Sequence, residues 1–532
     1  MLVSLGRISP IVLVVLGVLV PHAPAAQVTS LGSNLVQVSD FSGALPFANL
    51  MKQAVRFCSQ RIGDDYCEGK AIKFDANGYP RSLPRNHLAR GTVVSDSGLL
   101  PAGLYRATWK GKGKIQIPYG VATQVAKEAR SVTFEITPTS ETPIEMNITK
   151  TDPDNHLRDL RLMLPGSGNG ARTEMFNPAY LELLAPYDSL RFMDWGVTNL
   201  NKIVAFSDRT KPGNLTYALG KGVPVEIMID LANTLQVDPW FNVPTNAGDD
   251  YIMGMAEMIN RCLSPGLVPS VEYSNETWNS VFRQYGITQE RGEALGLGDG
   301  DPFVAGLQYT AHRSLEIWDI WDSVFGSRPY RRVLASAAVN TFTGETLLAY
   351  GRSEGEPTAG ERADAYAIAP YFNVPGLDDP ERLDEMRSLS VDELLDRAQA
   401  NIAGSTRDAM IANMTMAETF GVELVAYEGG QHLVGAAGNQ DDEQLTNSVI
   451  AANRADMMET LYADYLDVWA TEVGGQFNHF NDVTMPSRSG SWGSVEYLGQ
   501  DPADAPKLRA LSAFAAQVNG TPHTPVPITP CK

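Results

Sequence analysis

The 532-residue chain is poor in cysteine, histidine and positive charge, and each shortage excludes a class of protein. Its four cysteines and seven histidines are not at metal-ligand spacing, which argues against a zinc enzyme. Lys and Arg number 42 against 62 Asp and Glu, so the net charge is −20. Such an acidic surface repels the phosphates of nucleic acids. We therefore expect no metal and no nucleic-acid partner.

Long apolar runs are also missing after the N-terminus. Beyond residue 25, no stretch approaches the roughly 18 apolar residues that a membrane helix needs. Residues 1–25 are predicted to be a signal peptide, with Arg7 before an apolar run from Ile11 to Val20 and small residues at 23–25. An uncleaved membrane anchor is the alternative. We expect a secreted or periplasmic protein with no stable membrane association after signal removal.

The four cysteines are an even number in a chain predicted to be exported, which indicates two disulfides. Cys58–Cys67 would close a short loop, and Cys262–Cys531 would join the C-terminal tail, residues 521–532, to the main domain. Four cysteines allow three pairings, and free buried thiols are the alternative.

The length predicts one large domain and a smaller one, because a single core stops growing well below 532 residues. The apolar fraction of 43% excludes wholesale disorder. Residues 26–157 are predicted to form a β-rich, sandwich-like N-terminal domain. Its short alternating runs lie at 103–109, 114–117, 131–136 and 144–148.

From residue 158 to about 520, short apolar runs alternate with long amphipathic stretches, as in repeated βα units. Helices are predicted over 303–325 and 445–469. Eight units predict an α/β fold of the (β/α)8 TIM-barrel class. An open doubly wound sheet is the alternative, although no Gly-x-Gly-x-x-Gly turn follows an early strand. The expected strands are 160–164, 190–193, 238–243, 269–274, 332–336, 365–369, 423–427 and 472–477.

Two carboxylates, Glu276 and Glu428, follow the expected fourth and seventh strands. In a barrel, the residues after strand ends face the active site, and strands four and seven lie nearly opposite each other. Hydrolysis of a glycosidic bond needs such a pair, one carboxyl to protonate the leaving oxygen and one to attack or to activate water. Glu272 lies lower on the fourth strand, where a structural role is expected. Either glutamate alone would also suit a simple ion pair.

These residues resemble the glycoside hydrolases of clan A, the barrel enzymes with catalytic glutamates after strands four and seven. The resemblance spans about residues 158–515. It implies that Glu276 is the acid/base and Glu428 the nucleophile of a retaining reaction, that Asn275 binds the sugar 2-hydroxyl, and that Arg191 and Tyr371 contact the nucleophile. The run from Tyr273 to Asn279 also resembles exported bacterial proteins often labelled cellulose-binding. One departure is Thr277, where many clan members have proline.

Several further residues near expected strand ends are candidates for substrate binding. Some of the tryptophans would stack on sugar rings, and the others would be packing residues. Asn275-Glu276-Thr277 is also a glycosylation sequon. The candidates are Trp195, Trp240, Asn246, Trp278, His432 and Trp492.

The expected electrostatics assign the two roles. Arg191 is expected to lower the pKa of Glu428, whereas Glu276, farther from a cation, is expected to keep its proton near neutral pH. The chain is thus predicted to be an exported glycoside hydrolase for a β-linked polysaccharide or oligosaccharide, with no cofactor. A non-catalytic carbohydrate-binding barrel is the alternative. An esterase is disfavoured because the chain has no Gly-x-Ser-x-Gly elbow.

Overall fold

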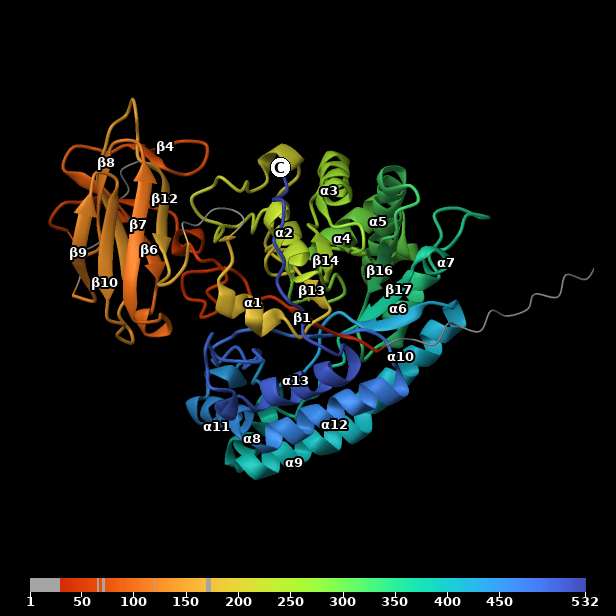
Figure 1. The fold of residues 1–532 in the computed structure, drawn as a ribbon. Coiled ribbons are helices and arrows are strands. Elements are labelled where there is room, and N and C mark those ends of the chain that lie inside the picture. The colour runs from red at the N-terminus through yellow and green to blue at the C-terminus, as the bar shows by residue number, and fades with distance from the viewer. Residues whose placement is uncertain (1–28, 65–66, 69–71, 119, 169–173) are drawn as a thin grey trace, which may run out of the picture.

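The computed structural model describes residues 29–532 except 65–66, 69–71, 119 and 169–173. The predicted signal peptide lies outside these residues. The chain has two parts, a small one made of β-sheets and a larger one in which helices surround a barrel (Figure 1). None of the described helices is long and apolar enough to cross a membrane.

The larger part is a closed barrel of eight parallel strands, which confirms the predicted (β/α)8 architecture. One set of side chains fills the barrel interior, with Trp240 and Tyr427 as its largest members. The strands, in order around the barrel, are β1 (Leu31–Asn34), β13 (Ser189–Arg191), β14 (Asp238–Val243), β15 (Ser270–Tyr273), β16 (Arg331–Ala335), β17 (Ala365–Ile368), β18 (Glu423–Ala426) and β19 (Phe477–His479).

The prediction of the first barrel strand is wrong. Residues 158–163 form β12 (Arg158–Met163), which pairs antiparallel with a strand of the small part. The first barrel strand is β1, between β13 and β19. The barrel therefore begins before the β-rich part and not at residue 158, and strands β2 to β12 are inserted between β1 and the first helix. The sequence analysis missed β1 because its four residues, Leu-Gly-Ser-Asn, have no alternating apolar pattern typical of a strand.

Two other boundaries also differ from the prediction. The eighth strand begins at Phe477 because helix α12 (Met457–Glu472) continues through Glu472, where the strand was expected to start. The single helix predicted over 445–469 is two helices, α11 (Glu443–Arg454) and α12. Ala455 between them has extended backbone angles, φ −69° and ψ 143°, which end α11.

The predicted helix over 303–325 is confirmed as α5 (Pro302–Phe325). Asp301 caps it by accepting hydrogen bonds from two backbone N–H groups, and Pro302 fits the first turn. The other described helices are α1 (Pro178–Leu184), α2 (Val225–Leu235), α3 (Asp249–Cys262), α4 (Arg283–Ala294), α6 (Thr341–Leu348), α7 (Ala359–Arg362), α8 (Leu383–Ser388), α9 (Val391–Asn401), α10 (Arg407–Phe420) and α13 (Pro506–Val518).

The small part consists of a four-stranded and a five-stranded sheet, whose buried side chains form one shared core. This confirms the predicted sandwich-like sheets at the N-terminal side of the chain. In sheet order the strands are β12, β7 (Gly103–Lys110), β10 (Ser131–Ile136) and β9 (Ala122–Glu128), then β3 (Cys67–Glu68), β2 (Cys58–Arg61), β6 (His87–Val94), β11 (Ile144–Thr151) and β8 (Gly113–Gln116). A separate hairpin pairs β4 (Lys73–Phe74) with β5 (Pro80–Ser82).

The sandwich and the barrel are packed together. Leu215, from the loop after β13, is buried in the sandwich core. Phe47, from the segment between β1 and β2, packs on Trp195 and Tyr217 of the same barrel loop, with centroids 5.7 and 5.3 Å apart. Cys58–Cys67 and Cys262–Cys531 are both disulfides, as predicted. The second ties the C-terminus to α3, near α2 (Figure 1).

Substitution of Gly32 by alanine tests the assignment of β1. A Cβ atom at this position would lie 1.9 Å from Asn478 Oδ1 and 2.8 Å from the backbone oxygen of Ser189. We expect Gly32→Ala to lower the free energy of unfolding by about 1–3 kcal/mol, as overpacking does. Urea unfolding measures this effect.

The matched control is Gly286→Ala in α4, where a Cβ atom meets nothing within 4 Å. This change should be neutral or stabilising, because alanine favours helix. Equal stability of the wild type and both variants would contradict the position of β1 inside the barrel.

Candidate active site

Glu276 and Glu428 lie just after β15 and β18, the fourth and seventh strands around the closed barrel. Parallel strands of a barrel all end at one mouth, so both side chains belong to the same face of the molecule. The Glu276 side chain is half-buried, whereas Glu428 is only 5% exposed.

The backbone after β15 bends sharply to present Glu276. Ser274 and Glu276 have positive φ angles of 61° and 40°, in the left-handed region that side chains other than glycine rarely adopt. Two side chains stabilise this bend through hydrogen bonds to its backbone. Gln284 Nε2 donates to the backbone oxygen of Asn275 at 2.7 Å, and Asn242 Nδ2 donates to the backbone oxygen of Ser274 at 2.9 Å. Strain of this kind persists where the surroundings over-determine it, which is common at functional sites.

Both oxygens of Glu276 accept hydrogen bonds from neutral groups. Asn279 Nδ2 donates to Oε2 at 2.7 Å, and the Tyr427 hydroxyl donates to Oε1 at 3.1 Å. Neither donor carries a charge. The contacts of Glu276 therefore orient its carboxyl group without a cation that would fix it in the ionised form.

Glu428 has a different set of partners. Arg191 Nη1 donates to Oε1 at 2.6 Å, and the Tyr371 hydroxyl donates to Oε2 at 3.1 Å. The following residues must be glycine, because a Cβ at Gly429 would lie 2.4 Å from the Phe477 ring and Gly430 has a φ of 141°. The Glu-Gly-Gly motif thus lets the chain turn directly behind the carboxylate.

Arg191 is fully buried and lies at the centre of the site. Besides Glu428, it donates from Nε at 3.1 Å and from Nη2 at 2.9 Å to Glu272. Its Nη2 also donates to Asn275 Oδ1 at 2.9 Å, and its Nη1 donates to Asn34 Oδ1 at 3.1 Å. The guanidinium therefore connects residues of the first, second, fourth and seventh barrel strands or of the turns that follow them.

The expected lowering of the Glu428 pKa is wrong in its net direction. Burial raises the pKa of Glu428 to about 8; Arg191 opposes this rise, and the neighbouring Glu276 adds to it. The pKa of Glu276 is also raised, again by burial, against the hydrogen bonds from Asn279 and Tyr427. The single positive charge of Arg191 is shared between Glu272 and Glu428, so it cannot neutralise all the carboxylates of the site. The pair Glu276 and Glu428 consequently retains a proton more readily than exposed glutamates do.

A group of half-buried aromatic side chains lies beside Glu428. Tyr371, His432, Phe480 and Trp492 have ring centroids 5.2 to 6.4 Å apart. Burial lowers the pKa of His432, so it favours the neutral form. Partly exposed rings at one site offer the apolar faces on which sugar rings stack. Three of the predicted substrate-binding residues are thus brought together next to Glu428.

Other predicted binding residues lie elsewhere. Trp195 and Trp240 are 1% and 0% exposed and act in packing; the Trp240 indole also donates to Glu272 at 2.8 Å. Asn246 is half-buried, and its Oδ1 accepts a hydrogen bond from Arg291 at 2.8 Å. Trp278 is half-buried two residues after Glu276. Sequence position at a strand end did not distinguish an inward-packed tryptophan from an exposed one.

The structure also adds residues that the sequence analysis missed. Asn34, Asn279 and Tyr427 contact the charged side chains directly. Asn34 was hidden because β1 was not recognised as a barrel strand. Tyr427 and Asn279 lie within motifs already selected, one residue before Glu428 and three residues after Glu276. In the described part of the chain, no cluster of three or more His, Cys, Asp or Glu side chains is arranged to hold a metal ion.

Comparison with known proteins gives a weak likeness. No family model and no curated protein matches the chain. Among solved structures, the chain is similar to Bacteroides uniformis β-glucuronidase 2, with 10% identity over 81% of this chain and 48% of that one and a TM-score of 0.35. The chain thus spans about half the length of that enzyme.

Two further solved structures show a similar level of likeness. One is a 4-O-α-L-rhamnosyl-β-D-glucuronidase from Fusarium oxysporum, with 13% identity, coverage of 64% of this chain and 65% of that one, and a TM-score of 0.35. The other is an endo-β-1,4-mannanase from Cellulomonas fimi, with 12% identity, coverage of 65% and 68%, and a TM-score of 0.32. TM-scores this low do not indicate an activity for this chain.

Replacement of Arg191 by methionine tests how far the site depends on this cation. The change leaves buried Glu272 and Glu428 without a compensating charge, which typically costs about 3–5 kcal/mol of stability. We expect the loss to be larger at pH 8 than at pH 5, because protonation relieves the unpaired carboxylates. Urea unfolding at both pH values measures it.

The control for this substitution is Arg488→Met, which removes an exposed ion pair with Asp441. Exposed pairs contribute at most about 1 kcal/mol. A similar small effect of both substitutions would show that Arg191 is not the cation on which the buried carboxylates depend.

The raised pKa of Glu428 also predicts a pH dependence of stability. A carboxyl whose pKa is higher in the folded than in the unfolded state stabilises the fold at low pH, and this stabilisation is lost as the pH rises toward the folded pKa of about 8. Glu428→Gln cannot titrate. The difference in melting temperature, variant minus wild type, should therefore grow from pH 5 to pH 8, whereas a constant difference would contradict the raised pKa.

Proposed function

We propose that the chain is an exported, retaining glycoside hydrolase that cleaves a β-linked polysaccharide or oligosaccharide, such as a glucan, xylan or mannan. The observation that carries this proposal is the unequal pair of carboxyls at one barrel mouth. Glu428 is hydrogen-bonded to a guanidinium, and Glu276 only to neutral donors. Glycosidases need this inequality, because one carboxyl must be ionised while the other carries a proton.

In the first step, Glu428 attacks the anomeric carbon while Glu276 donates its proton to the leaving oxygen. A covalent glycosyl ester forms on Glu428, and the glycosidic bond breaks. In the second step, Glu276 takes a proton from water, and the water oxygen displaces Glu428 from the sugar. Two inversions restore the original configuration at the anomeric carbon, so the reaction proceeds with retention.

The remaining side chains hold the reactants in place. Arg191 and Tyr371 fix the two oxygens of Glu428, which leaves its carboxylate little freedom to rotate. Asn275 donates one of its two Nδ2 hydrogens to Asn199 at 3.1 Å, and we assign the other to the sugar 2-hydroxyl. Trp492, Tyr371 and His432 provide the surface against which a sugar ring packs.

The bound proton of the pair sets the working state. Glu272 and Glu428 are paired with the Arg191 guanidinium, and Glu276 is close enough to Glu428 to raise its pKa. Burial raises the pKa of Glu428 to about 8, so the pair holds a proton; we assign the reactive state to the arrangement in which this proton lies on Glu276 and the negative charge on Glu428, beside Arg191. Export is supported by the two disulfides, since such bonds persist in oxidising compartments.

Product analysis on a polysaccharide panel tests the proposal. The wild type, Glu276→Gln and Glu428→Gln are incubated with cellulose, xylan, mannan, β-1,3-glucan and mixed-linkage glucan, and soluble products are analysed by mass spectrometry. We expect oligosaccharides from the wild type, a loss of about 10²–10⁴-fold in Glu276→Gln, and no turnover in Glu428→Gln.

Glu418→Gln is the matched control, because it removes one exposed carboxylate near the C-terminal end of α10, which leads into the start of β18 at the end of the barrel opposite the mouth. It should leave the rate unchanged. If the wild type releases no product from any polymer and binds one of them as tightly as Glu428→Gln does, the chain is a carbohydrate-binding barrel and the hydrolase proposal fails.

A further inference from the structure

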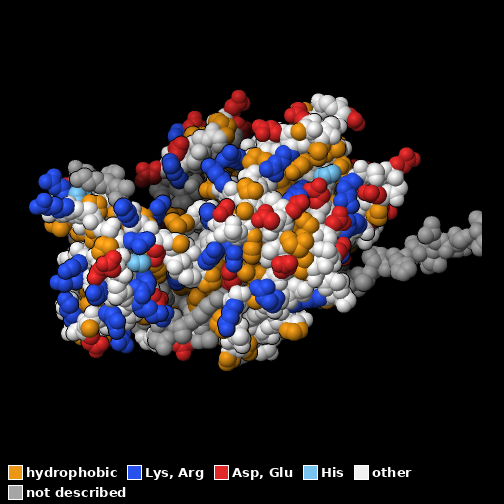
Figure 2. All heavy atoms as spheres, turned by 90° about the horizontal axis from the view of Figure 1, so that it is seen from above, with side chains coloured by type: hydrophobic (Ala, Val, Ile, Leu, Met, Phe, Trp, Pro, Cys, Tyr) orange, Lys and Arg blue, Asp and Glu red, His pale blue; other side chains and the backbone are white. Residues whose placement is uncertain are grey.

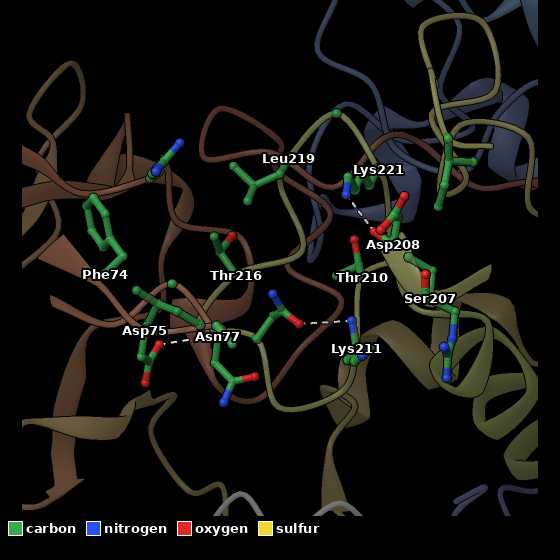
Figure 3. Close-up of a pocket in the computed structure, with 18 of the residues that line it drawn as sticks. Phe74, Asp75, Asn77, Ser207, Asp208, Thr210, Lys211, Thr216, Leu219 and Lys221 are labelled. Carbon is green, nitrogen blue, oxygen red and sulfur yellow. Dashed lines mark hydrogen bonds between the residues drawn. The ribbon is translucent and has the colours of Figure 1, made fainter. Parts of the chain in front are cut away.

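A cavity of about 930 Å³ lies between the sandwich and the barrel, away from the two carboxyls. One wall is the β4–β5 hairpin, with Phe74, Asp75 and Asn77. The opposite wall is the long loop between β13 and α2, which brings Asp208, Lys211 and Lys221 to the cavity (Figure 3). The proposed hydrolysis does not account for this cavity.

The walls of the cavity are fixed to one another by hydrogen bonds. The Leu215 N–H donates to the Asn77 oxygen at 2.9 Å, and the Tyr217 N–H donates to the Lys52 oxygen at 2.8 Å. Lys52 Nζ in turn donates to the backbone oxygens of Pro212 and Asn214. The cavity therefore exists before any ligand binds, and a ligand would not have to organise it.

Positive charge is concentrated in the cavity, although the chain as a whole has a net charge of −20. Five Lys and Arg side chains line it, against two acidic ones, Asp75 and Asp208. Asp75 is already engaged, since it accepts hydrogen bonds from two backbone N–H groups and contacts His156. The five basic residues are Arg56, Lys202, Arg209, Lys211 and Lys221.

Two of the lysines have no ion-pair partner among the described residues, and Arg56 lies over the Phe74 ring with its Cζ 4.8 Å from the ring centroid. Lys202 and Lys211 are exposed, and neither forms an ion pair with a residue that the structure describes. Arg209, in contrast, is paired with Glu226 at 2.7 Å, and Lys221 donates to the Asp208 backbone oxygen at 2.6 Å. Lys202 and Lys211 are thus free to meet an anionic ligand.

The sandwich adds to this positive field. Residues 58–163 contain 15 Lys and Arg against 12 Asp and Glu, whereas acidic residues dominate the rest of the chain. Seen from above, Lys and Arg side chains are numerous over the sandwich and at its border with the barrel (Figure 2). A patch of opposite sign to the whole molecule attracts and orients anions.

One loop connects the cavity to the proposed catalytic site. Asn199, in the loop after β13, accepts hydrogen bonds from Asn275 at 3.1 Å and from Gln284 at 2.6 Å. The next residue, Leu200, is 68% exposed and lines the cavity together with Leu219. Adjacent residues of one loop thus contact the proposed catalytic site and line the cavity.

We propose that this cavity is a distal binding site for an acidic polysaccharide, one that carries carboxylate or sulfate groups. Lys202 and Lys211 bind the anionic groups, and Leu200 and Leu219 contact the apolar faces of sugar rings. The inference rests on the proposed function and narrows it, since it makes the preferred substrate a long anionic glycan and not a short neutral one.

Affinity electrophoresis of the full-length protein tests the binding step. The background is Glu428→Gln, so that no polymer is consumed. The probes are two matched pairs: carboxymethylcellulose with neutral hydroxyethylcellulose, and dextran sulfate with neutral dextran. We expect retardation by an anionic polymer and not by its neutral partner, and the two pairs show whether carboxylates or sulfates are preferred.

The variant Lys202→Gln/Lys211→Gln should bind the anionic polymer about tenfold more weakly, at roughly threefold for each exposed charge pair. The matched control is Lys114→Gln/Lys127→Gln, which removes two exposed charges from the sandwich strands β8 and β9. We expect little change in the control. Equal weakening in both double variants, or equal binding of charged and neutral polymers, would overturn the proposal.

A kinetic experiment separates this inference from the proposed hydrolysis. In the otherwise wild-type protein, Lys202→Gln/Lys211→Gln should raise KM for the anionic polymer and leave kcat/KM for a short neutral aryl glycoside unchanged. If no glycoside is hydrolysed but the binding difference persists, the hydrolase proposal fails and the anion site stands. If hydrolysis is normal and the lysines do not matter, only the distal site is refuted.

Discussion

The buried guanidinium of Arg191 is the group on which the rest of the site depends. It is 0% exposed and makes hydrogen bonds to Asn34, Glu272, Asn275 and Glu428, which belong to the first, fourth and seventh barrel strands or to the turns that follow them. Taking these charges out of water costs several kcal/mol for each ion, and the mutual attraction offsets this only in a well-ordered geometry. Such a network contributes less to stability than to fixing where each polar atom lies, which is what a two-carboxyl reaction requires.

The same network explains why acidic groups accumulate at the mouth of a stable barrel. The site has more carboxyls than cations in a region of low dielectric constant, so the pair Glu276 and Glu428 has its lowest free energy when it keeps one proton. The raised pKa of Glu428 reflects this preference. The positive φ at Glu276 is a second local cost at the same place. Sites that carry charge and strain of this kind are commonly the places where a fold gives up stability for activity.

The parts of the structure that could be predicted from the sequence are those with a long or repeated signal. Strands β14 to β18 have apolar runs, α5 has a full helical period, and Glu276 and Glu428 stand directly after two of those strands. The first strand could not be found, because Leu31–Asn34 is short, polar and separated from the rest of the barrel by the whole sandwich. Trp195 and Trp240 are buried by segments distant in the sequence, which no local pattern encodes. For the same reason the sequence did not reveal that burial raises the pKa of Glu428 more than Arg191 lowers it.

The assignment of roles to the two glutamates is tested most directly by chemical rescue with azide. Glu276→Ala and Glu428→Ala are each incubated with sodium azide and an activated aryl β-glycoside of the sugar that the wild type cleaves, and the glycosyl azide is identified by NMR. We expect a β-azide from Glu276→Ala, because azide attacks the covalent intermediate, and an α-azide from Glu428→Ala, because azide replaces the nucleophile. The same anomer from both variants, or the reverse pattern, would contradict this assignment.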